Sequence, residues 1–162
     1  MDNDFKSKTP FRDKLEKELE PRIVEIPAKW YKSMGTGSMV IPTPLLIESL
    51  IKKIPKGKLT TIKLIREKLA RDFNTDTASP IDTQTYLKII ADAVEEDLES
   101  GKKDVSPYWR VLKDDGSLNP KLHDGIKFQY KHLADEDFEF ITAESKHVIK
   151  VRYYDKVLFD FS

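Results

Sequence analysis

The sequence contains no cysteine among its 162 residues. This absence excludes disulfides, thiolate zinc sites and a cysteine nucleophile. A run of about 18 apolar residues is also lacking, so the sequence predicts no membrane-spanning helix and no membrane partner. The first residues, MDNDFKSKTPFRDKLEKELEPR, mix acids with bases and have no apolar core, unlike a signal peptide. We therefore expect a cytoplasmic protein.

An excess of one charge is lacking as well, because Lys plus Arg and Asp plus Glu both number 28. The charges are nevertheless unevenly distributed. Residues 51–71 hold many bases and one acid, and residues 92–99 hold acids and no base. A phosphate-binding stripe and two solvated helix faces of opposite sign both fit this pattern. The bases are Lys52, Lys53, Lys56, Lys58, Lys63, Arg66, Lys68 and Arg71, and the acids are Asp92, Glu95, Glu96, Asp97 and Glu99.

The length fits one domain preceded by an arm. Residues 1–40 are predicted as an N-terminal arm and extended segment, because they are rich in charge, proline and glycine. Residues 41–140 are predicted as a helix-turn-helix domain. Residues 141–162 are predicted as a C-terminal extension, in which alternating apolar residues favour a β-hairpin turning near Asp155.

Apolar residues recur at helical spacing in three segments, 44–54, 61–70 and 83–98. Thr43 followed by Pro44 is a typical helix start, Thr60 or Thr61 can cap the second helix, and Asp82 or Thr83 can open the third. Three helices in this order have the outline of a helix-turn-helix. The inward positions of the third helix are predicted to be Leu87, Ile90, Ala91, Val94 and Leu98.

The stretch SPYWRVL, residues 106–112, is predicted as a strand that starts a short hairpin, with a turn at Asp115–Gly116. The following helix is expected to end near Asp137, with Ile126, Tyr130 and Leu133 inward. The predicted fold class is therefore α+β: a three-helix core with a helix-turn-helix, winged-helix-like, plus a small β-hairpin and the C-terminal extension.

A helix-turn-helix places the start of its last helix in the major groove, so double-stranded DNA is the predicted partner. Bases in the first half of the domain suit phosphates, and polar side chains at the third helix start suit base edges. The predicted DNA-binding residues are Lys56, Lys58, Thr60, Thr61, Lys63, Thr83, Gln84, Thr85 and Lys88.

Three motifs in order resemble the methylated-DNA–protein cysteine methyltransferases. IPKGKLTTIKLIREKLA (54–70) is similar to the start of that family's helix-turn-helix, and PYWRVL (107–112) falls where the family has Pro-Cys-His-Arg-Val-Val. DDGSLNPKLHDGIKFQYKHLADEDFEF (114–140) is similar to the closing segment. The resemblance covers residues 41–140 and implies a DNA-binding domain of the cysteine-less, alkyltransferase-like kind, which binds alkylated guanine without repairing it.

The acceptor cysteine position holds Tyr108, and the neighbouring histidine position holds Trp109. A phenol with an ordinary pKa near about 10 cannot replace the thiolate, so we predict no methyltransferase activity. The two rings have two interpretations: they fill a vestigial pocket together with Pro107 and Arg110, or they form a stacking wall for an extruded base. Arg110 is predicted to make a structural salt bridge.

Two functions follow. The first is a non-catalytic DNA-binding protein, with alkylated guanine as a candidate target. The alternative is a protein-interaction module that uses the arm or the C-terminal hairpin on a fold that has lost its lesion pocket. An enzyme is disfavoured, and no cofactor or metal is predicted, because His123, His132 and His147 are scattered along the sequence without metal-ligand spacing.

Overall fold

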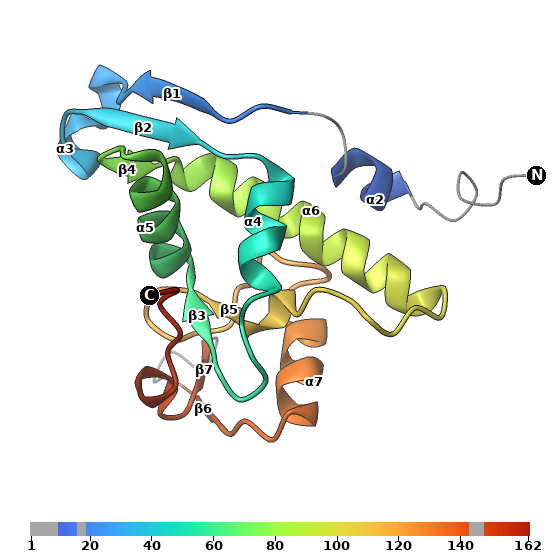
Figure 1. Cartoon of the computed structure of the whole chain (residues 1–162). Coiled ribbons are helices and arrows are strands. Elements are labelled where there is room, and N and C mark those ends of the chain that lie inside the picture. The colour runs from blue at the N-terminus through green and yellow to red at the C-terminus, as the bar shows by residue number, and fades with distance from the viewer. Residues whose placement is uncertain (1–9, 16–18, 143–147) are drawn as a thin grey trace, which may run out of the picture.

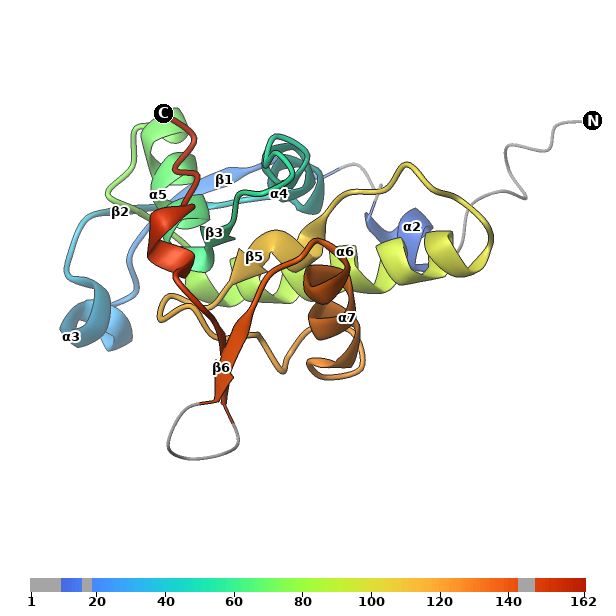
Figure 2. The same ribbon diagram turned by 90° about the horizontal axis from the view of Figure 1, so that it is seen from below.

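The computed structural model describes residues 10–15, 19–142 and 148–162. It is an α+β fold built on one long helix, α6 (Pro80–Glu99), which runs through the middle of the molecule in both views (Figures 1 and 2). Helices α2 (Pro10–Leu15), α4 (Pro44–Ile51) and α5 (Ile62–Phe73) contact α6. The 3-10 turn η2 (Tyr108–Arg110) contacts α4, α6 and α7 (Lys127–Asp135). In the described part of the chain, no helix has the length and apolar character needed to cross a membrane.

Helices α4 and α5 begin where the sequence predicts. The Thr43 hydroxyl accepts from the Leu46 N–H (3.2 Å) in front of Pro44 at the first helical position. The Thr61 hydroxyl accepts from the Leu64 N–H in the same way (3.2 Å). Helix α5 continues past residue 70 to Phe73 and ends at Asn74, whose φ of 54° is left-handed.

Helix α6 begins earlier than predicted. The prediction placed the start at Asp82 or Thr83, but Ser79 is the cap, and its hydroxyl accepts from the Asp82 N–H (3.2 Å). Pro80 occupies the first helical position, where its missing N–H costs nothing. The predicted inward face is confirmed at four positions that are fully buried: Leu87, Ile90, Ala91 and Val94.

The N-terminal segment joins the helical domain through a sheet. Strand β1 (Arg22–Glu25) is antiparallel to β2 (Ser38–Ile41), and β2 is parallel to β4 (Thr77–Ala78), which precedes α6. The 3-10 turn η1 (Ala28–Trp30) and the short helix α3 (Tyr31–Met34) connect β1 to β2. Helix α2 lies against the second half of α6 in Figures 1 and 2.

The predicted strand 106–112 and its hairpin are wrong. Residues 108–110 form the turn η2, and only β5 (Val111–Leu112) is extended. Strand β5 pairs in parallel with β3 (Thr60–Thr61), so its partner comes from far upstream instead of from a hairpin. The predicted turn does form: the Gly116 N–H donates to the Lys113 carbonyl (2.9 Å), and Gly116 has a φ of 87°.

The C-terminal hairpin turns at a different place from the prediction. Strand β6 (Phe140–Thr142) is antiparallel to β7 (Ile149–Val151), so the chain reverses between these strands. Residues near Asp155 form the 3-10 turn η3 (Tyr154–Lys156), after which Leu158 pairs in parallel with Leu59. Helix α7 ends two residues before the predicted Asp137. Its buried side chains are Gln129 and Leu133, whereas Tyr130 is 42% exposed.

Candidate nucleic-acid interface

The first two turns of α6 present one exposed face. Ile81 is 57% exposed, Thr85 is exposed, and the Lys88 side chain is 53% exposed. Spacings of three and four residues place these side chains on the same side of the helix. Thr83 lies on the other side, 1% exposed, with its hydroxyl donating to the Ser79 carbonyl (2.7 Å). The structure therefore removes Thr83 from the predicted DNA-binding set.

A surface hollow of about 610 Å³ follows this face. A second hollow of about 320 Å³ shares Pro80, Gln84 and Lys121 with it, so the two adjoin each other. The second hollow extends to Lys113, which the loop after β5 brings close to α6. That loop is tied to the helix because Asn119 Nδ2 donates to Gln84 Oε1 (2.9 Å). The Gln84 amide thus points toward the loop, which leaves Thr85 and Lys88 as the predicted α6 residues that are fully presented.

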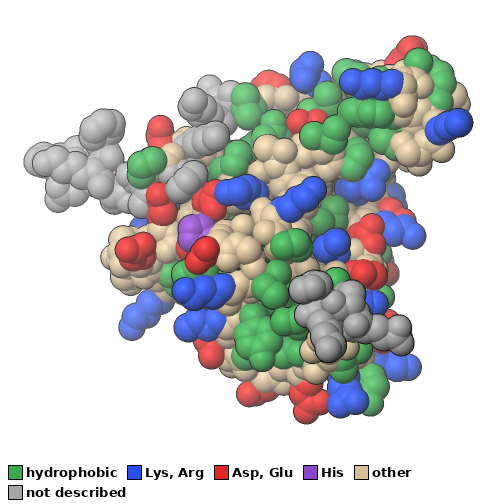
Figure 3. Space-filling view, turned by 180° about the vertical axis from the view of Figure 1, so that it is seen from behind, with side chains coloured by type: hydrophobic (Ala, Val, Ile, Leu, Met, Phe, Trp, Pro, Cys, Tyr) green, Lys and Arg blue, Asp and Glu red, His purple; other side chains and the backbone are tan. Residues whose placement is uncertain are grey.

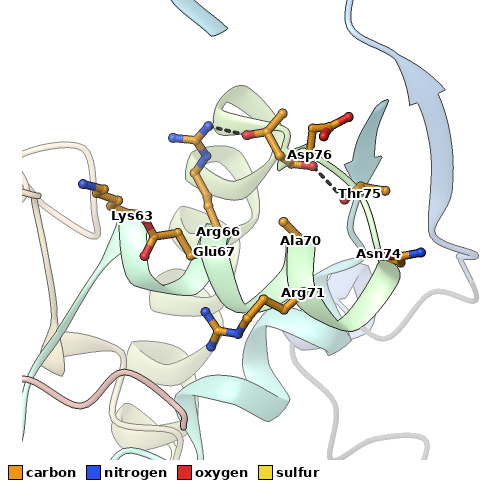
Figure 4. Close-up of a pocket in the computed structure, with 9 residues that line it drawn as sticks. Lys63, Arg66, Glu67, Ala70, Arg71, Asn74, Thr75 and Asp76 are labelled. Atoms are coloured by element: carbon orange, nitrogen blue, oxygen red, sulfur yellow. Dashed lines mark hydrogen bonds between the residues drawn. The ribbon is translucent and has the colours of Figure 1, made fainter. Parts of the chain in front are cut away.

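Helix α5 borders the same surface. A hollow of about 600 Å³ lies between its outer side and residues 74–77, lined by Lys63, Arg66 and Arg71 among others (Figure 4). Arg66 points into the loop and donates to the Ala78 carbonyl (2.9 Å) and the Thr77 hydroxyl (3.1 Å). Burial lowers the pKa of Arg66, against the opposing effect of nearby Asp114. Arg66 lines both the α5 hollow and the smaller α6 hollow, so it forms a structural link between them.

The predicted lysines fall into two groups. Lys63 is exposed at the start of α5 and lines the α5 hollow, which shares Arg66 with the smaller α6 hollow. Lys56 and Lys58 are exposed in the segment between α4 and β3, which Figure 1 places at the opposite end of β3 from the start of α6. Thr60 and Thr61 are 0% and 4% exposed, so they too leave the predicted set. Their hydroxyls are used inside the protein, because Thr60 donates to the Phe159 carbonyl (2.9 Å) and Thr61 caps α5.

We call the exposed surface around the start of α6 the lysine face. Its lysines come from α5, from α6 and from the loop after β5, and all of them are exposed. Asp114 lies among them, with its carboxylate accepting from the backbone N–H of Lys63 (2.9 Å). On the side seen in Figure 3, basic, acidic and apolar side chains are interspersed instead of forming one large basic patch. The lysine face consists of Lys88, Lys113 and Lys121 around Ile81 and Thr85, together with Lys63 of the neighbouring α5 hollow.

Tyr108 and Trp109 lie in the core. Tyr108 is fully buried, and its hydroxyl donates to Glu95 Oε2 (2.5 Å). Trp109 is 9% exposed, stacks on His132 at a centroid distance of 4.2 Å and donates from Nε1 to Glu136 (3.1 Å). This is the arrangement that the filled-pocket interpretation describes. A stacking wall for an extruded base would require exposed ring faces.

Two neighbouring residues complete this buried cluster. Arg110 donates to Glu136 through Nε (3.0 Å) and through a second nitrogen (2.6 Å), the structural salt bridge that the sequence predicts. Pro107 is half-buried beside η2. Burial raises the pKa of Tyr108, and the hydrogen bond to Glu95 raises it further. The phenol therefore stays protonated and is a poor nucleophile.

Three of the five acids in the acidic segment of α6 are buried and paired, contrary to the interpretation of a solvated acidic face, whereas Glu99 is exposed. Asp92, Glu95 and Asp97 are 4%, 7% and 4% exposed. Asp97 pairs with Arg12 of α2 (3.0 Å), and Glu95 bonds His132 Nε2 (2.8 Å). These carboxylates hold α2, α7 and the loop before α7 against the central helix.

His123 and His132, distant in the sequence from α6, meet it in space. Both line a hollow of about 510 Å³ together with Phe128 and Lys131. His123 Nδ1 bonds Asp92 Oδ1 (2.7 Å), which places one histidine on each of two neighbouring α6 carboxylates. In the described part of the chain, no three His, Asp or Glu side chains are arranged to hold a metal ion. His147 lies outside the described residues.

These features define an α+β domain in which the start of α6, the longest described helix, is exposed and lies near several lysines. No family model matches the chain, and no curated protein matches its sequence. Among solved structures, the chain is similar to the crystal structure of S. pombe Atl1 in complex with damaged DNA containing O6-carboxymethylguanine. The identity is 17% and the TM-score 0.48, over 72% of this chain and 93% of that chain. Values at this level define neither the family nor the function of this chain.

Proposed function

We propose that the protein binds duplex DNA, without catalysis, through the lysine face. The observation that carries the proposal is the exposed start of α6, where Ile81 and Thr85 lie among lysines of α6 and of the loop after β5. Lys63 of α5 lines the neighbouring hollow. Exposed lysines around a helix start suit DNA phosphates, and the side chains between them can approach base edges in a groove. The motif order that resembles the methylated-DNA–protein cysteine methyltransferases supports the same partner.

Chemistry on the DNA is not part of the proposal. The chain has no cysteine, and the residue at the acceptor position is a buried, hydrogen-bonded phenol. Alkylated guanine stays a candidate target only while the base remains stacked in the duplex. An extruded base would find no open space between Tyr108 and Trp109, which are buried. We therefore expect equal affinity for duplexes with and without O-alkylguanine.

Fluorescence anisotropy of a labelled duplex at increasing salt tests the proposal. The test variant reverses Lys63, Lys113 and Lys121 to Glu. The control variant reverses Lys52, Lys56 and Lys58, which are also exposed and change the net charge equally. Each phosphate contact adds about 0.9 to the slope of log affinity against log salt, so the test variant should lose up to about 2.7 of that slope.

The control variant should keep most of the parent's affinity and slope. Equal losses in the two variants would show that only total charge matters and would refute the lysine face as the site. A parent protein that binds no duplex even at low salt would refute the DNA proposal itself.

A second function, a protein-interaction module, is favoured by apolar side chains exposed on the N-terminal segment. Ile23 is 58% exposed on β1 and Tyr31 is 45% exposed on α3. β1 is the edge strand of its sheet. Exposed apolar side chains on an edge strand suit a protein partner. Absence of duplex binding, together with a partner lost on Ile23→Asp substitution, would establish this function instead.

A further inference from the structure

One lysine of the lysine face is linked to a histidine through a buried carboxylate. Lys88 Nζ bonds Asp92 Oδ2 (2.8 Å), and His123 Nδ1 bonds the other oxygen of the same carboxylate, Oδ1 (2.7 Å). The side-chain exposures are 53% for Lys88, 6% for Asp92 and 30% for His123. A buried carboxylate therefore connects a proposed phosphate-binding lysine to a partly solvated imidazole.

The hydrogen bonding fixes how this triad takes up a proton. An ionised carboxylate only accepts hydrogen bonds, so the neutral His123 ring donates from Nδ1 and carries its lone pair on Nε2. With neutral His123, the charges of Lys88 and Asp92 cancel. When Nε2 is protonated, the imidazolium satisfies Asp92, and the triad carries a net positive charge at the edge of the lysine face.

We propose that His123, acting through Asp92, sets the positive charge that Lys88 offers to a DNA phosphate, so that duplex binding strengthens as the pH falls. This inference rests on the proposed function and adds its regulation. The cause is electrostatic: a Lys88 that shares its carboxylate with a cationic imidazole is less neutralised and interacts more strongly with a nearby phosphate.

Other charged groups surround His123, and all of them except His132 are the same in the parent and in both variants described below. Helix α6 contributes Glu95, whose own pKa responds to the charge of His123, and Glu99 on the rim of the hollow. Helix α7 contributes Lys131 and His132 to the same hollow. The neighbours on the loop itself are Lys121 and Asp124.

His132 provides a matched control. It is also bonded to an α6 carboxylate, through Nε2 to Glu95 (2.8 Å), and its side chain is 15% exposed. Glu95 is shared with the hydroxyl of Tyr108, however, and not with a lysine of the lysine face. Protonation of His132 therefore adds charge inside the molecule without changing the pairing of Lys88.

The experiment measures duplex affinity by anisotropy at about pH 5.5 and about pH 8, on either side of the ordinary histidine pKa near 6.5. The variants are His123→Asn, whose amide can replace the Nδ1 donor, and His132→Gln, whose amide can replace the Nε2 donor. Circular dichroism at both pH values confirms that each variant is folded.

We expect the parent and His132→Gln to bind about two- to fivefold more tightly at the lower pH. This change in affinity corresponds to the free energy that one exposed ion pair contributes. His123→Asn should bind alike at both pH values. Two outcomes overturn the inference: a parent whose affinity does not change with pH, or a His123→Asn variant that keeps the parent's pH dependence. Both leave DNA binding intact, whereas a parent that binds no duplex at either pH removes the proposed function and this inference together.

Discussion

Replacing Trp109 by alanine should cost about 3 to 5 kcal/mol of unfolding free energy, because the ring is a filled part of the core. Trp109 is 9% exposed and packs between Tyr108 and His132, with ring centroids 5.5 Å and 4.2 Å away. Aromatic pairs of this kind contribute about 0.5 to 1.5 kcal/mol beyond the area they bury. The indole N–H also bonds Glu136, which would keep its two bonds from Arg110 in the variant.

The protein contains a second tryptophan that serves as the control. Trp30 is half-buried in η1, where it lies under the Lys29 ammonium at 5.3 Å from the ring centroid. Its replacement by alanine should cost less than about 2 kcal/mol of unfolding free energy, because truncating a half-buried ring leaves almost no enclosed cavity. Trp109→Phe keeps an aromatic ring on His132 and should recover most of the loss.

Urea unfolding followed by circular dichroism measures these differences in one buffer, by linear extrapolation to zero denaturant. If Trp109→Ala is so destabilised that it does not fold, Trp109→Phe still gives a measurable loss. A Trp109→Ala variant within about 1 kcal/mol of the parent would refute the filled pocket. Combined with a preference of the parent for O-alkylguanine duplexes that the variant loses, it would support a stacking wall instead.

Three further predictions concern chemistry, acid stability and the start of α6. Incubation with duplex DNA labelled on an O-alkylguanine should leave no label on the protein; stoichiometric label would contradict the assignment of Tyr108. Burial alone would raise the pKa of Glu95, but hydrogen bonds from His132 and Tyr108 outweigh burial and lower it. A lowered folded pKa means that this stability is present above about pH 4.3, the ordinary unfolded value, and is lost as the pH falls through the folded pKa. The urea midpoint of the parent should therefore decrease as the pH is lowered, and that of Glu95→Gln should decrease less. The same decrease in both proteins would refute the contribution of Glu95 to acid stability. Ser79→Ala should cost about 1 kcal/mol through loss of the α6 cap, and an unchanged urea midpoint would count against that cap.

The sequence by itself determined the helices whose signals are local. Caps at Thr43 and Thr61, and apolar residues spaced by three and four, act within one or two turns and predicted α4 and α5. The start of α6 was misplaced because Ser79 and Pro80 follow a stretch whose composition is typical of a loop. In α7 the period alone could not distinguish Tyr130 from Gln129. Gln129 is buried because its amide donates to the carbonyls of Trp109 and Val111, and its oxygen accepts from the N–H of Asn119.

The tertiary structure decided everything that depends on residues distant along the chain. Strands β3 and β5 have two residues each, too short for a detectable period, and they form because they pair with each other. That pairing buries Thr60 and Thr61, which looked like surface residues in the sequence. The lysine face depends on Lys113 and Lys121, which belong to a loop that the Asn119–Gln84 hydrogen bond ties to α6. Scattered histidines likewise became paired groups only where α6 supplies carboxylates, because a buried charge requires a partner and the sequence does not say which segment provides it.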